Sequence, residues 1–505
     1  MKSHHFLLGI DLGTTYLKAI LIDEEGKVIT EARTQHETSN PKPDYYEQNP
    51  IVWWENLKNL LQRILRSVEA NNIKGVSFSG QMHGLVLLDK EGAPLIPSIT
   101  WEDKRAEEIS LEMEKRLGWE NIKNTLGNKP MPGFTLPKLL WIKRNLPRVY
   151  RKTFKVLLPK GFLRYKLTGN LSMELSDASS GLLVNVKNRE WAEDIFKEIN
   201  LDLDKLPKLY ESTDVTGRVT DRAANDIGIE PKTPVVAGAG DQQAGAIGGG
   251  INEEGEFSAT IGTGGQIYTV SNNFYVEPEG RVHTFCHAFS DQWLIMGAMK
   301  TAGRALEWFK NEIMSYLSEN AESTSYGSLD KLAQQSEPGS KGLIFLPYLA
   351  GERTPHLDPS AKGLFFGLSL SHSLPQMVRS VMEGVSYNMK YSLELLLELD
   401  LPLTELRLEG GGVKSSVWPQ IQADIFEENL TVSEFKYDKS VYGAAVLAGL
   451  GIGDFTDLRE NKELYEGRKT EYEISPDSSN SPIYSSNYEL FKRLYPSVKD
   501  LFQFS

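Results

Sequence analysis

The chain has 505 residues, of which 24% are charged and 40% hydrophobic. This composition is typical of globular proteins and excludes a largely disordered chain. At about 100 to 200 residues per domain, the length predicts two large domains or about three smaller ones. The formal net charge of −13 argues against nucleic acid and anionic membranes as partners, because both attract basic surfaces.

The cysteine count and the hydropathy indicate where the protein works. Cys286 is the only cysteine, so no disulfide can form within the chain and a secreted scaffold is disfavoured. No apolar stretch approaches the about 18 residues that a membrane-spanning helix needs. The sequence therefore predicts a soluble cytoplasmic protein.

The first ninety residues read as a mixture of strands and one helix. A turn, Asp11-Leu12-Gly13-Thr14-Thr15, separates the first two apolar runs, which predicts an antiparallel meander. Asn49-Pro50 is a helix start signal, and the apolar residues after it have helical spacing. We expect strands at 6–10, 16–22, 27–34, 73–79 and 85–88, a helix at 50–68, and a loop at 80–84. This pattern indicates an α/β domain.

A second set of the same signals begins about 250 residues later. An apolar strand at 234–239 runs into Gly240-Asp241-Gln242-Gln243, and the strands expected at 257–261 and 266–270 flank the turn Gly262-Thr263-Gly264-Gly265. Two Gly-Thr turns of one kind predict two structurally similar halves. The Gly-rich, acidic segment 248–255 is the candidate boundary, which divides the chain into domains 1–248 and 249–505. Near the end of the chain, residues 475–486 contain two Pro and six Ser and predict a surface linker before a helix at 488–501.

The two Gly-Thr turns could bind a polyphosphate. Glycine lets phosphate oxygens approach backbone N–H groups, and Thr14, Thr15 and Thr263 add hydroxyls. Asp11, at the end of the first strand, could hold Mg²⁺ that bridges phosphate oxygens. The alternative is that both turns are ordinary hairpins with Gly and Thr at turn positions.

Asp241 follows a run of small and apolar residues, so we expect it at the carboxyl edge of a strand, where ligands bind in α/β sheets. A carboxylate there could accept the proton of a substrate hydroxyl that attacks a γ-phosphate. Its alternative role is to cap the helix that follows.

Two histidine-containing segments are less specific. Met82-His83 pairs an apolar and a polar side chain that suit the face and edge of a sugar, or His83 is simply a loop histidine with its hydrogen bonds satisfied. The segment 283–287 carries two His and Cys286 but no further ligand at a usual zinc spacing, so we expect a structural role for it.

Together these motifs resemble the FGGY family of carbohydrate kinases, and within it the xylulokinases. The resemblance runs in order from about residue 6 to 450. It rests on the segments 11–15, 79–84, 131–135, 137–141, 157–160, 176–179, 238–241, 283–288, 351–356, 365–368 and 410–415. It implies an α/β protein with the actin-like ATPase (ribonuclease H-like) fold: two lobes, each built on a mixed five-stranded sheet with helices, and a catalytic cleft between them. The first lobe would bind the sugar and the second the nucleotide.

The resemblance also implies roles for individual residues. Asp241 would be the general base and Asp11 would lie near Mg²⁺. The other residues carried over from the family fall into a sugar group and an ATP group: Met82, His83, Trp101, Asp103 and Gln242 for the sugar, and Thr14, Thr15, Thr263, Gly303, Gly411 and Ser415 for ATP.

The expected activity is phosphorylation of a ketopentose by ATP and Mg²⁺, with D-xylulose converted to D-xylulose 5-phosphate. Three departures bear on the sugar: Gln242 stands where xylulokinases usually have Asn, Trp101-Glu102-Asp103-Lys104-Arg105 is nearer to FGGY gluconokinases, and Gly264 replaces a Ser. D-gluconate, D-ribulose and glycerol are therefore the alternative substrates. A non-catalytic, actin- or chaperone-like ATP-binding protein is the alternative of another class. Dimers are common in the family, which makes a homodimer the expected assembly.

Overall fold

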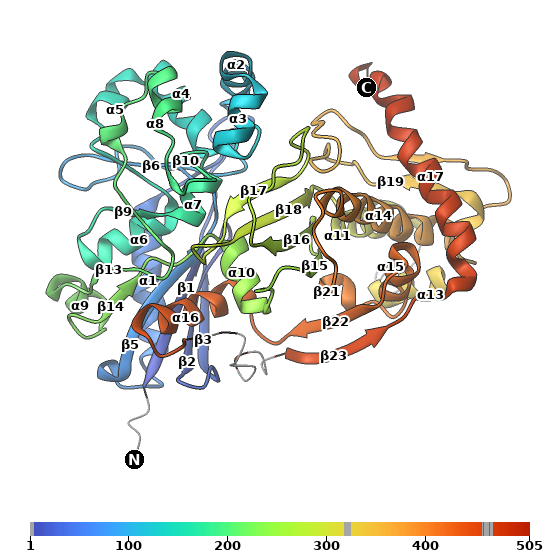
Figure 1. Cartoon of the computed structure of the whole chain (residues 1–505). Coiled ribbons are helices and arrows are strands. Elements are labelled where there is room, and N and C mark those ends of the chain that lie inside the picture. The colour runs from blue at the N-terminus through green and yellow to red at the C-terminus, as the bar shows by residue number, and fades with distance from the viewer. Residues whose placement is uncertain (1–4, 318–324, 457, 459–463, 465–467, 505) are drawn as a thin grey trace.

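The structure is a computed structural model that describes residues 5–317, 325–456, 458, 464 and 468–504. The chain forms two lobes that lie side by side, each built on a large twisted sheet (Figure 1). In the described part of the chain, no helix is both long and apolar enough to cross a membrane.

The sheet of the N-terminal lobe has six strands, in the order β13-β14-β5-β1-β2-β3. Antiparallel pairs join β1 to β2 and β2 to β3, whereas β5 lies parallel to both β1 and β14. β13 pairs antiparallel with β14 at the edge. The strands are β1 Phe6–Leu12, β2 Tyr16–Asp23, β3 Val28–Gln35, β5 Ile73–Gly80, β13 Val215–Arg218 and β14 Pro234–Val236.

The sheet of the C-terminal lobe has seven strands, in the order β17-β18-β16-β15-β21-β22-β23. β16 is antiparallel to β15 and β18, and β21 is parallel to β15 and β22. The strands are β15 Glu256–Ile261, β16 Gly265–Ser271, β17 His283–Cys286, β18 Trp293–Met299, β21 Glu405–Gly410, β22 Leu430–Phe435 and β23 Arg468–Ile474.

The two sheets share one five-stranded pattern. If the edge strands β13, β17 and β23 are left out, the third, second, first, fourth and fifth strands in chain order are β3-β2-β1-β5-β14 in one lobe and β18-β16-β15-β21-β22 in the other. The prediction of two similar halves is confirmed. The predicted count of five strands per sheet is too low, because antiparallel edge strands extend the shared pattern: β13 in the first lobe, and β17 and β23 in the second.

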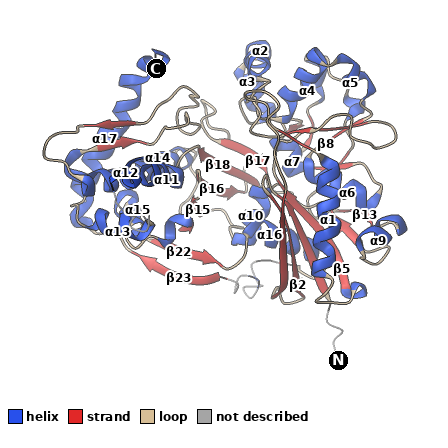
Figure 2. Ribbon diagram, turned by 180° about the vertical axis from the view of Figure 1, so that it is seen from behind, coloured by secondary structure: helices blue, strands red, loops and turns tan. Residues whose placement is uncertain are grey.

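Helices cover both faces of the N-terminal sheet. On one face, apolar residues of α1 (Pro50–Ile64), α6 (Pro159–Thr168) and α9 (Asp221–Ile227) pack on β1, β2 and β5 (Figure 2). On the other face lie α10 (Asp241–Gly249) and α16 (Lys439–Ile452). Because α16 comes late in the chain yet packs on β1 and β5, the structural lobes do not divide cleanly at residue 248 (Figure 1).

The remaining elements complete the two lobes. In the first lobe, short strand pairs form beside the helices: β4 (Glu47–Gln48) with β7 (Ser98–Ile99), β6 (Val86–Leu88) with β8 (Lys155–Leu157), β9 (Ser172–Glu174) with β12 (Lys208–Tyr210), and β10 (Val184–Asn185) with β11 (Glu190–Trp191). Its other helices are α2 Glu107–Leu117, α3 Trp119–Leu126, α4 Thr135–Asn145, α5 Pro147–Lys152, α7 Leu175–Ser180 and α8 Glu193–Glu198. The second lobe adds β19 (Ile344–Leu346) paired with β20 (Leu364–Phe366), and the helices α11 Gly303–Trp308, α12 Ser315–Leu317, α13 Tyr326–Gln334, α14 Leu374–Leu397, α15 Trp418–Phe426 and α17 Ser481–Val498.

Two predicted elements are longer than the observed ones. The side chain of Asn49 caps α1, but the helix ends at Ile64 because the next two residues in the sequence after Leu65 are polar and exposed, so no buried face continues. β14 ends at Val236 instead of residue 239, because Gly238 has a φ of 78° and leaves the extended conformation.

The end of the chain differs most from the prediction. Residues 475–486 are not a linker throughout, since α17 already begins at Ser481. Pro482 is compatible with a first helical turn, where its missing N–H costs nothing. Tyr484 is buried, and its hydroxyl accepts a hydrogen bond from Arg379 at 2.8 Å, so tertiary packing extends the helix into the Ser-rich segment.

Candidate active site

The two Gly-Thr turns occupy equivalent places in the two sheets. Residues 13–15 connect β1 to β2, and residues 262–264 connect β15 to β16. The Gly13 N–H donates to the Tyr16 carbonyl at 3.0 Å, and the Gly262 N–H donates to the Gly264 carbonyl at 2.9 Å. Thr15 and Thr263 are exposed. Both turns therefore present glycine backbone and a threonine at the end of the first strand of their sheet.

The first turn is tied to the segment predicted to bind the sugar. The indole N–H of Trp101 donates to Thr14 Oγ1 at 2.9 Å. Gln48 Nε2 donates to the Thr14 carbonyl at 2.7 Å, and Gln81 Nε2 donates to Gln48 Oε1 at 2.8 Å. Sequence analysis did not assign a role to Gln48 or Gln81, because nothing local connects two glutamines 33 positions apart.

The second turn is surrounded by glycines from other segments. The Gly303 N–H donates to the Gly262 carbonyl at 2.9 Å, and a Cβ at Gly303 would lie 2.4 Å from that oxygen. A Cβ at Gly411 would lie 3.7 Å from the Ile261 carbonyl oxygen. The structure thus brings Thr263, Gly303 and Gly411 together at the end of β15.

Ser415 lies a few residues beyond this cluster and its hydroxyl is engaged within the protein. Ser415 Oγ donates to Asp330 Oδ1 at 2.7 Å and accepts from the N–H of Trp418, the first residue of α15, at 3.0 Å. These bonds fix the start of α15. Asp330, on α13, was not predicted from the sequence.

Asp241 is the first residue of α10 and does not cap it. The capping position belongs to Gly240, and no side chain caps this helix, so the alternative interpretation of Asp241 as a cap is wrong. The residue as a whole is half-buried. Burial raises the pKa of Asp241 to about 7; the negative charges of Asp11 and Asp177 act in the same direction, and hydrogen bonds from Gln242 oppose them.

Asp11 lies at a meeting point of the two halves of the chain. It is buried, its Oδ1 accepts from Ser79 Oγ at 3.0 Å, and its Oδ2 lies 3.3 Å from Lys18 Nζ. Lys18 also pairs with Asp438 at 2.8 Å. Burial raises the pKa of Asp11, and the positive charge of Lys18 opposes that effect.

The start of α16 contacts both Lys18 and Asp241. Asp438 caps α16 through the N–H groups of Ser440 and Val441, and Ser440 Oγ donates to the Asp241 carbonyl at 2.9 Å. Sequence analysis missed Lys18 and Asp438. The only signal for Lys18 was a cation within the otherwise apolar run 17–22, and Asp438 carried none.

A buried polar network lies behind Asp241. Lys160 Nζ donates to Glu174 Oε1 at 2.7 Å and to Asp177 Oδ2 at 2.5 Å. Ser176 Oγ accepts from the Gly240 N–H at 3.0 Å. These residues fix the backbone just before Asp241. Lys160, Ser176 and Asp177 lie in segments that the family resemblance identified without a role, and Glu174 lies just outside them.

His83 is held in an unusual conformation by three hydrogen bonds. Its φ is 68°, its carbonyl accepts from Thr135 Oγ1 and from Lys138 Nζ, both at 2.8 Å, and its Nδ1 lies 2.8 Å from the Ser180 carbonyl. Since a carbonyl only accepts, Nδ1 carries the proton and Nε2 is left as an acceptor. Burial holds the pKa of His83 well below its usual value, so the ring is neutral.

Met82 lies against the residue before Asp241. A Cβ at Gly240 would lie 2.9 Å from Met82 Cγ, so only glycine permits this approach. The imidazole of His83 stacks on Phe134 with ring centroids 4.3 Å apart. Met82 and His83 thus reach the neighbourhood of Asp241 on a well-packed loop.

Asp103 does not fit the predicted contact with the sugar. It has no exposed surface, and both of its oxygens are bound: Tyr46 N–H donates at 2.8 Å, and Arg105 donates through its backbone and its guanidinium. Burial and these bonds make it a structural residue of the 99–105 loop. Trp101 and Gln242 are half-buried, the latter next to Asp241 in the sequence.

The His-Cys-His segment lies in the interior of the protein. His283, Cys286 and His287 are buried, and His283 Nδ1 lies 3.1 Å from Asn128 Oδ1. Within the described ranges, no group of three or more His, Cys, Asp or Glu side chains could hold a metal ion.

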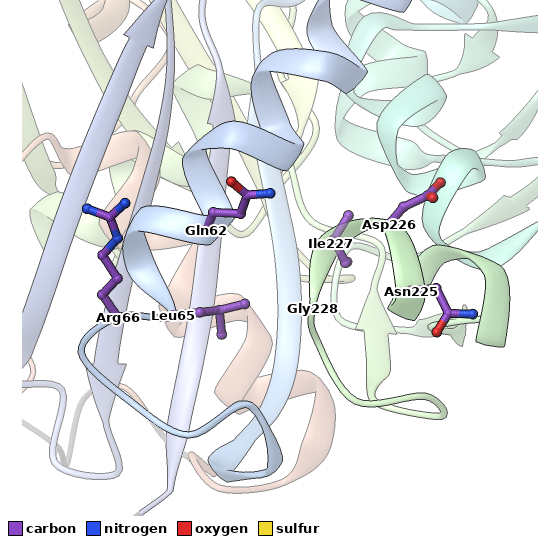
Figure 3. A pocket seen from close by; sticks show the side chains of 7 residues that line it. All are labelled: Gln62, Leu65, Arg66, Asn225, Asp226, Ile227 and Gly228. Carbon is purple, nitrogen blue, oxygen red and sulfur yellow. The ribbon is translucent and has the colours of Figure 1, made fainter.

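A surface pocket lies elsewhere, between the end of α1 and α9 (Figure 3). None of the predicted site residues lines it. Its lining consists of Gln62, Leu65, Arg66, Asn225, Asp226, Ile227 and Gly228. This pocket is therefore separate from the site around Asp241.

Comparisons with known proteins agree with this arrangement. Residues 6–248 match the N-terminal domain of the FGGY family of carbohydrate kinases, and residues 257–452 match its C-terminal domain. Xylulose kinase of Staphylococcus xylosus is 35% identical over 97% of this chain and 99% of its own length. Among solved structures, xylulose kinase from Rhodospirillum rubrum superposes with a TM-score of 0.92 at 27% identity, covering 99% of this chain and 100% of that one. Gluconate kinase from Lactobacillus acidophilus superposes equally well, with a TM-score of 0.92 at 25% identity and full coverage of both chains.

The two family domains together span most of the sequence, and the relatives match along nearly their whole length. The non-catalytic alternative loses its support, because the matched family consists of carbohydrate kinases with ATP as phosphoryl donor. The chain belongs to the FGGY family of carbohydrate kinases.

Proposed function

We propose that this kinase transfers the γ-phosphoryl group of ATP to O5 of D-xylulose, with Asp241 as the general base. One observation carries the proposal: an uncapped aspartate at the start of α10, with a pKa raised to about 7, lies beside the Met82-His83 loop. A base with a pKa near the working pH can take a hydroxyl proton and still be largely ionised beforehand. The proton of the attacking hydroxyl would pass to the Asp241 carboxylate as the oxygen–phosphorus bond forms and ADP leaves.

The sugar would lie against Met82 and His83 of the N-terminal lobe. Neutral His83 has an acceptor at Nε2, which suits a sugar hydroxyl as donor, and Met82 offers an apolar surface to the C–H face. The ATP phosphates would lie between the Gly-Thr turns, where Thr14, Thr15 and Thr263 supply hydroxyls and Gly303 and Gly411 leave room. We propose that Ser415 acts there only by fixing the start of α15.

The residues around Asp11 fit a magnesium ion that arrives with the nucleotide. Mg²⁺ prefers carboxylate oxygens and is usually held by one or two of them together with phosphates and water. The negative charge of Asp11 raises the pKa of Asp241, so the two carboxylates are close enough that a cation beside them would be stabilised. Asp11 would hold the ion, which supplies charge neutralisation to the phosphates when bound.

A coupled assay of ADP release with MgATP tests the proposal. D-xylulose, D-ribulose, D-gluconate and glycerol are compared by kcat/KM. We expect D-xylulose to exceed the others by at least about tenfold, a difference of about 1.4 kcal/mol in transition-state binding. A preference for another sugar would replace D-xylulose while leaving the role of Asp241 intact.

D-gluconate is the second candidate, and two observations favour it. The gluconate kinase structure superposes as well as the xylulose kinase structure does. The segment Trp101-Glu102-Asp103-Lys104-Arg105 also resembles that of FGGY gluconokinases. The assignment of the sugar to the first lobe, the homodimer and the cytoplasmic location remain predictions of the sequence.

A further inference from the structure

Arg353 is a residue of the C-terminal lobe whose side chain reaches the Trp101 loop of the N-terminal lobe. It lies in the segment between β19 and β20, in the motif Gly351-Glu352-Arg353-Thr354-Pro355. Its guanidinium carbon stands 5.7 Å from the centre of the Trp101 ring. Trp101 in turn bonds Thr14 of the first phosphate turn. Arg353 therefore touches the part of the N-terminal lobe where sugar and phosphate would meet.

The guanidinium has no acceptor in the described part of the protein. Its Nε is buried without a hydrogen-bond partner, and no ion pair among the described residues includes Arg353. The adjacent Glu352 is occupied: its Oε1 accepts from the backbone N–H groups of Lys300 and Arg353, both at 2.8 Å, and its Oε2 accepts from Asn388 at 2.9 Å. A buried N–H without an acceptor costs free energy, so this arrangement implies a partner from outside the protein.

The groups around Arg353 cannot supply that partner. Its positive charge contributes to lowering the pKa of His83 and of His283, and both histidines are neutral. Lys300 is a further cation nearby, and Trp101 offers only a π face. The oxygen atoms that a planar, forked guanidinium prefers must come from a ligand.

The segment that carries Arg353 is fixed on both sides. Thr354 Oγ1 accepts from the Ala298 N–H at 3.1 Å and donates to the Arg281 carbonyl at 2.7 Å. His356 stacks on Tyr495 of α17 with ring centroids 3.6 Å apart. Arg353 is thus held in place before any ligand binds, which reduces the entropy that binding would cost.

We propose that Arg353 contacts the substrate directly, donating hydrogen bonds to an oxygen of the sugar bound beside His83 and Trp101. This inference rests on the proposed function, because it takes the sugar to lie at that loop. The C-terminal lobe then supplies one wall of the sugar site, and sugar binding draws the two lobes together.

The test compares Arg353→Gln and Arg353→Lys with wild type, using initial rates with each substrate varied in turn. We expect Arg353→Gln to raise KM for the sugar about 10- to 100-fold, as for loss of a hydrogen bond from a charged group, while KM for ATP stays within about twofold. Arg353→Lys keeps the charge and should recover part of the loss. Arg493→Gln, an exposed arginine on α17, is the matched control and should leave both constants unchanged.

Two results would overturn the inference: an unchanged sugar KM in Arg353→Gln, or equal rises of both KM values together with a lower melting temperature. The second result would mean that Arg353 is only structural. The measurement uses whichever sugar the wild-type enzyme turns over. A failure of D-xylulose as substrate therefore contradicts the proposed function without deciding the role of Arg353.

Discussion

The two lobes share a strand order but end their fourth strands in opposite ways. In the N-terminal lobe, β5 runs into Gln81, Met82 and His83. The Met82 side chain is buried, and the side chains of Gln81 and His83 are hydrogen-bonded. In the C-terminal lobe, β21 ends at Gly410, and Gly411 and Gly412 follow. One lobe therefore presents side chains at this edge and the other presents backbone. Side chains can distinguish sugars, whereas bare backbone leaves room for a nucleotide.

The helices after the fifth strands differ in the same way. α10 begins with Asp241, whose carboxyl group caps nothing. α16 is capped by Asp438, and its first residue, Lys439, pairs with the buried Glu409. At the equivalent helix start of the second lobe, the charge of Lys439 is thus neutralised by Glu409 within the protein. The shared scaffold therefore has one helix start whose carboxyl group caps nothing and one that is capped and charge-paired within the protein.

The largest effect should come from removing the carboxylate at the start of α10, the general base that we propose. We expect Asp241→Asn to lower kcat by about 10² to 10⁴ because it removes the general base but keeps the shape. ATP binding, measured by calorimetry, should be nearly unchanged. Asp221→Asn is the matched control, because Asp221 is also the first residue of a helix but is exposed and far from the site. Wild-type turnover in Asp241→Asn would show that the helix starts of the two lobes do not differ in function and that Asp241 is not the general base.

Two glycine substitutions test whether the sugar and ATP bind to different lobes. Gly240→Ala would place a Cβ 2.9 Å from Met82 Cγ, and Gly303→Ala would place one 2.4 Å from the Gly262 carbonyl oxygen. Because displacements of about 1 Å near a reaction centre can cost 10²-fold, we expect losses of kcat/KM of about 10- to 100-fold. The loss should appear mainly in KM for the sugar in the first variant and for ATP in the second.

The control for both is Gly327→Ala on α13, where the nearest atom to a new Cβ lies 3.8 Å away. It should behave like wild type. Equal effects of Gly240→Ala on both substrates would mean that the sugar and nucleotide sites are not divided between the lobes.

The smallest expected effect is a dependence of the rate on pH, which follows from the raised pKa of Asp241. The base must be deprotonated to act, so kcat/KM for the sugar should fall as the pH drops through about 7 and level off above it. At pH 6 the rate should be roughly tenfold below the plateau, as one pKa unit requires. An acid limb near pH 4, the ordinary carboxyl range, would show that burial and Asp11 do not raise the pKa of this group.

The sequence predicted those parts of the site whose residues lie close together in the chain. Both Gly-Thr turns, the strands around them and the surroundings of Asp241 follow from local patterns, since glycine and threonine at a strand end already specify a turn. The family resemblance added Trp101, which does bond the first turn. It also suggested Asp103 for the sugar, but a resemblance carries a position without its neighbours: in the structure this carboxylate is buried, Arg105 donates to its Oδ1 and the Tyr46 backbone donates to its Oδ2.

What the sequence alone determined, then, is an α/β fold with a duplicated strand and turn pattern, because hydrophobic spacing and turn chemistry act within a few residues. The family came from the resemblance of the short motifs to those of a known family. The tertiary structure decided which groups meet. Lys18 pairs with Asp438, and Arg353 lies over the Trp101 ring, although hundreds of residues separate the members of each pair in the sequence. It also decided that Asp241 titrates near neutrality, since burial and the charges of Asp11 and Asp177 arise only when separate strands and helices pack together.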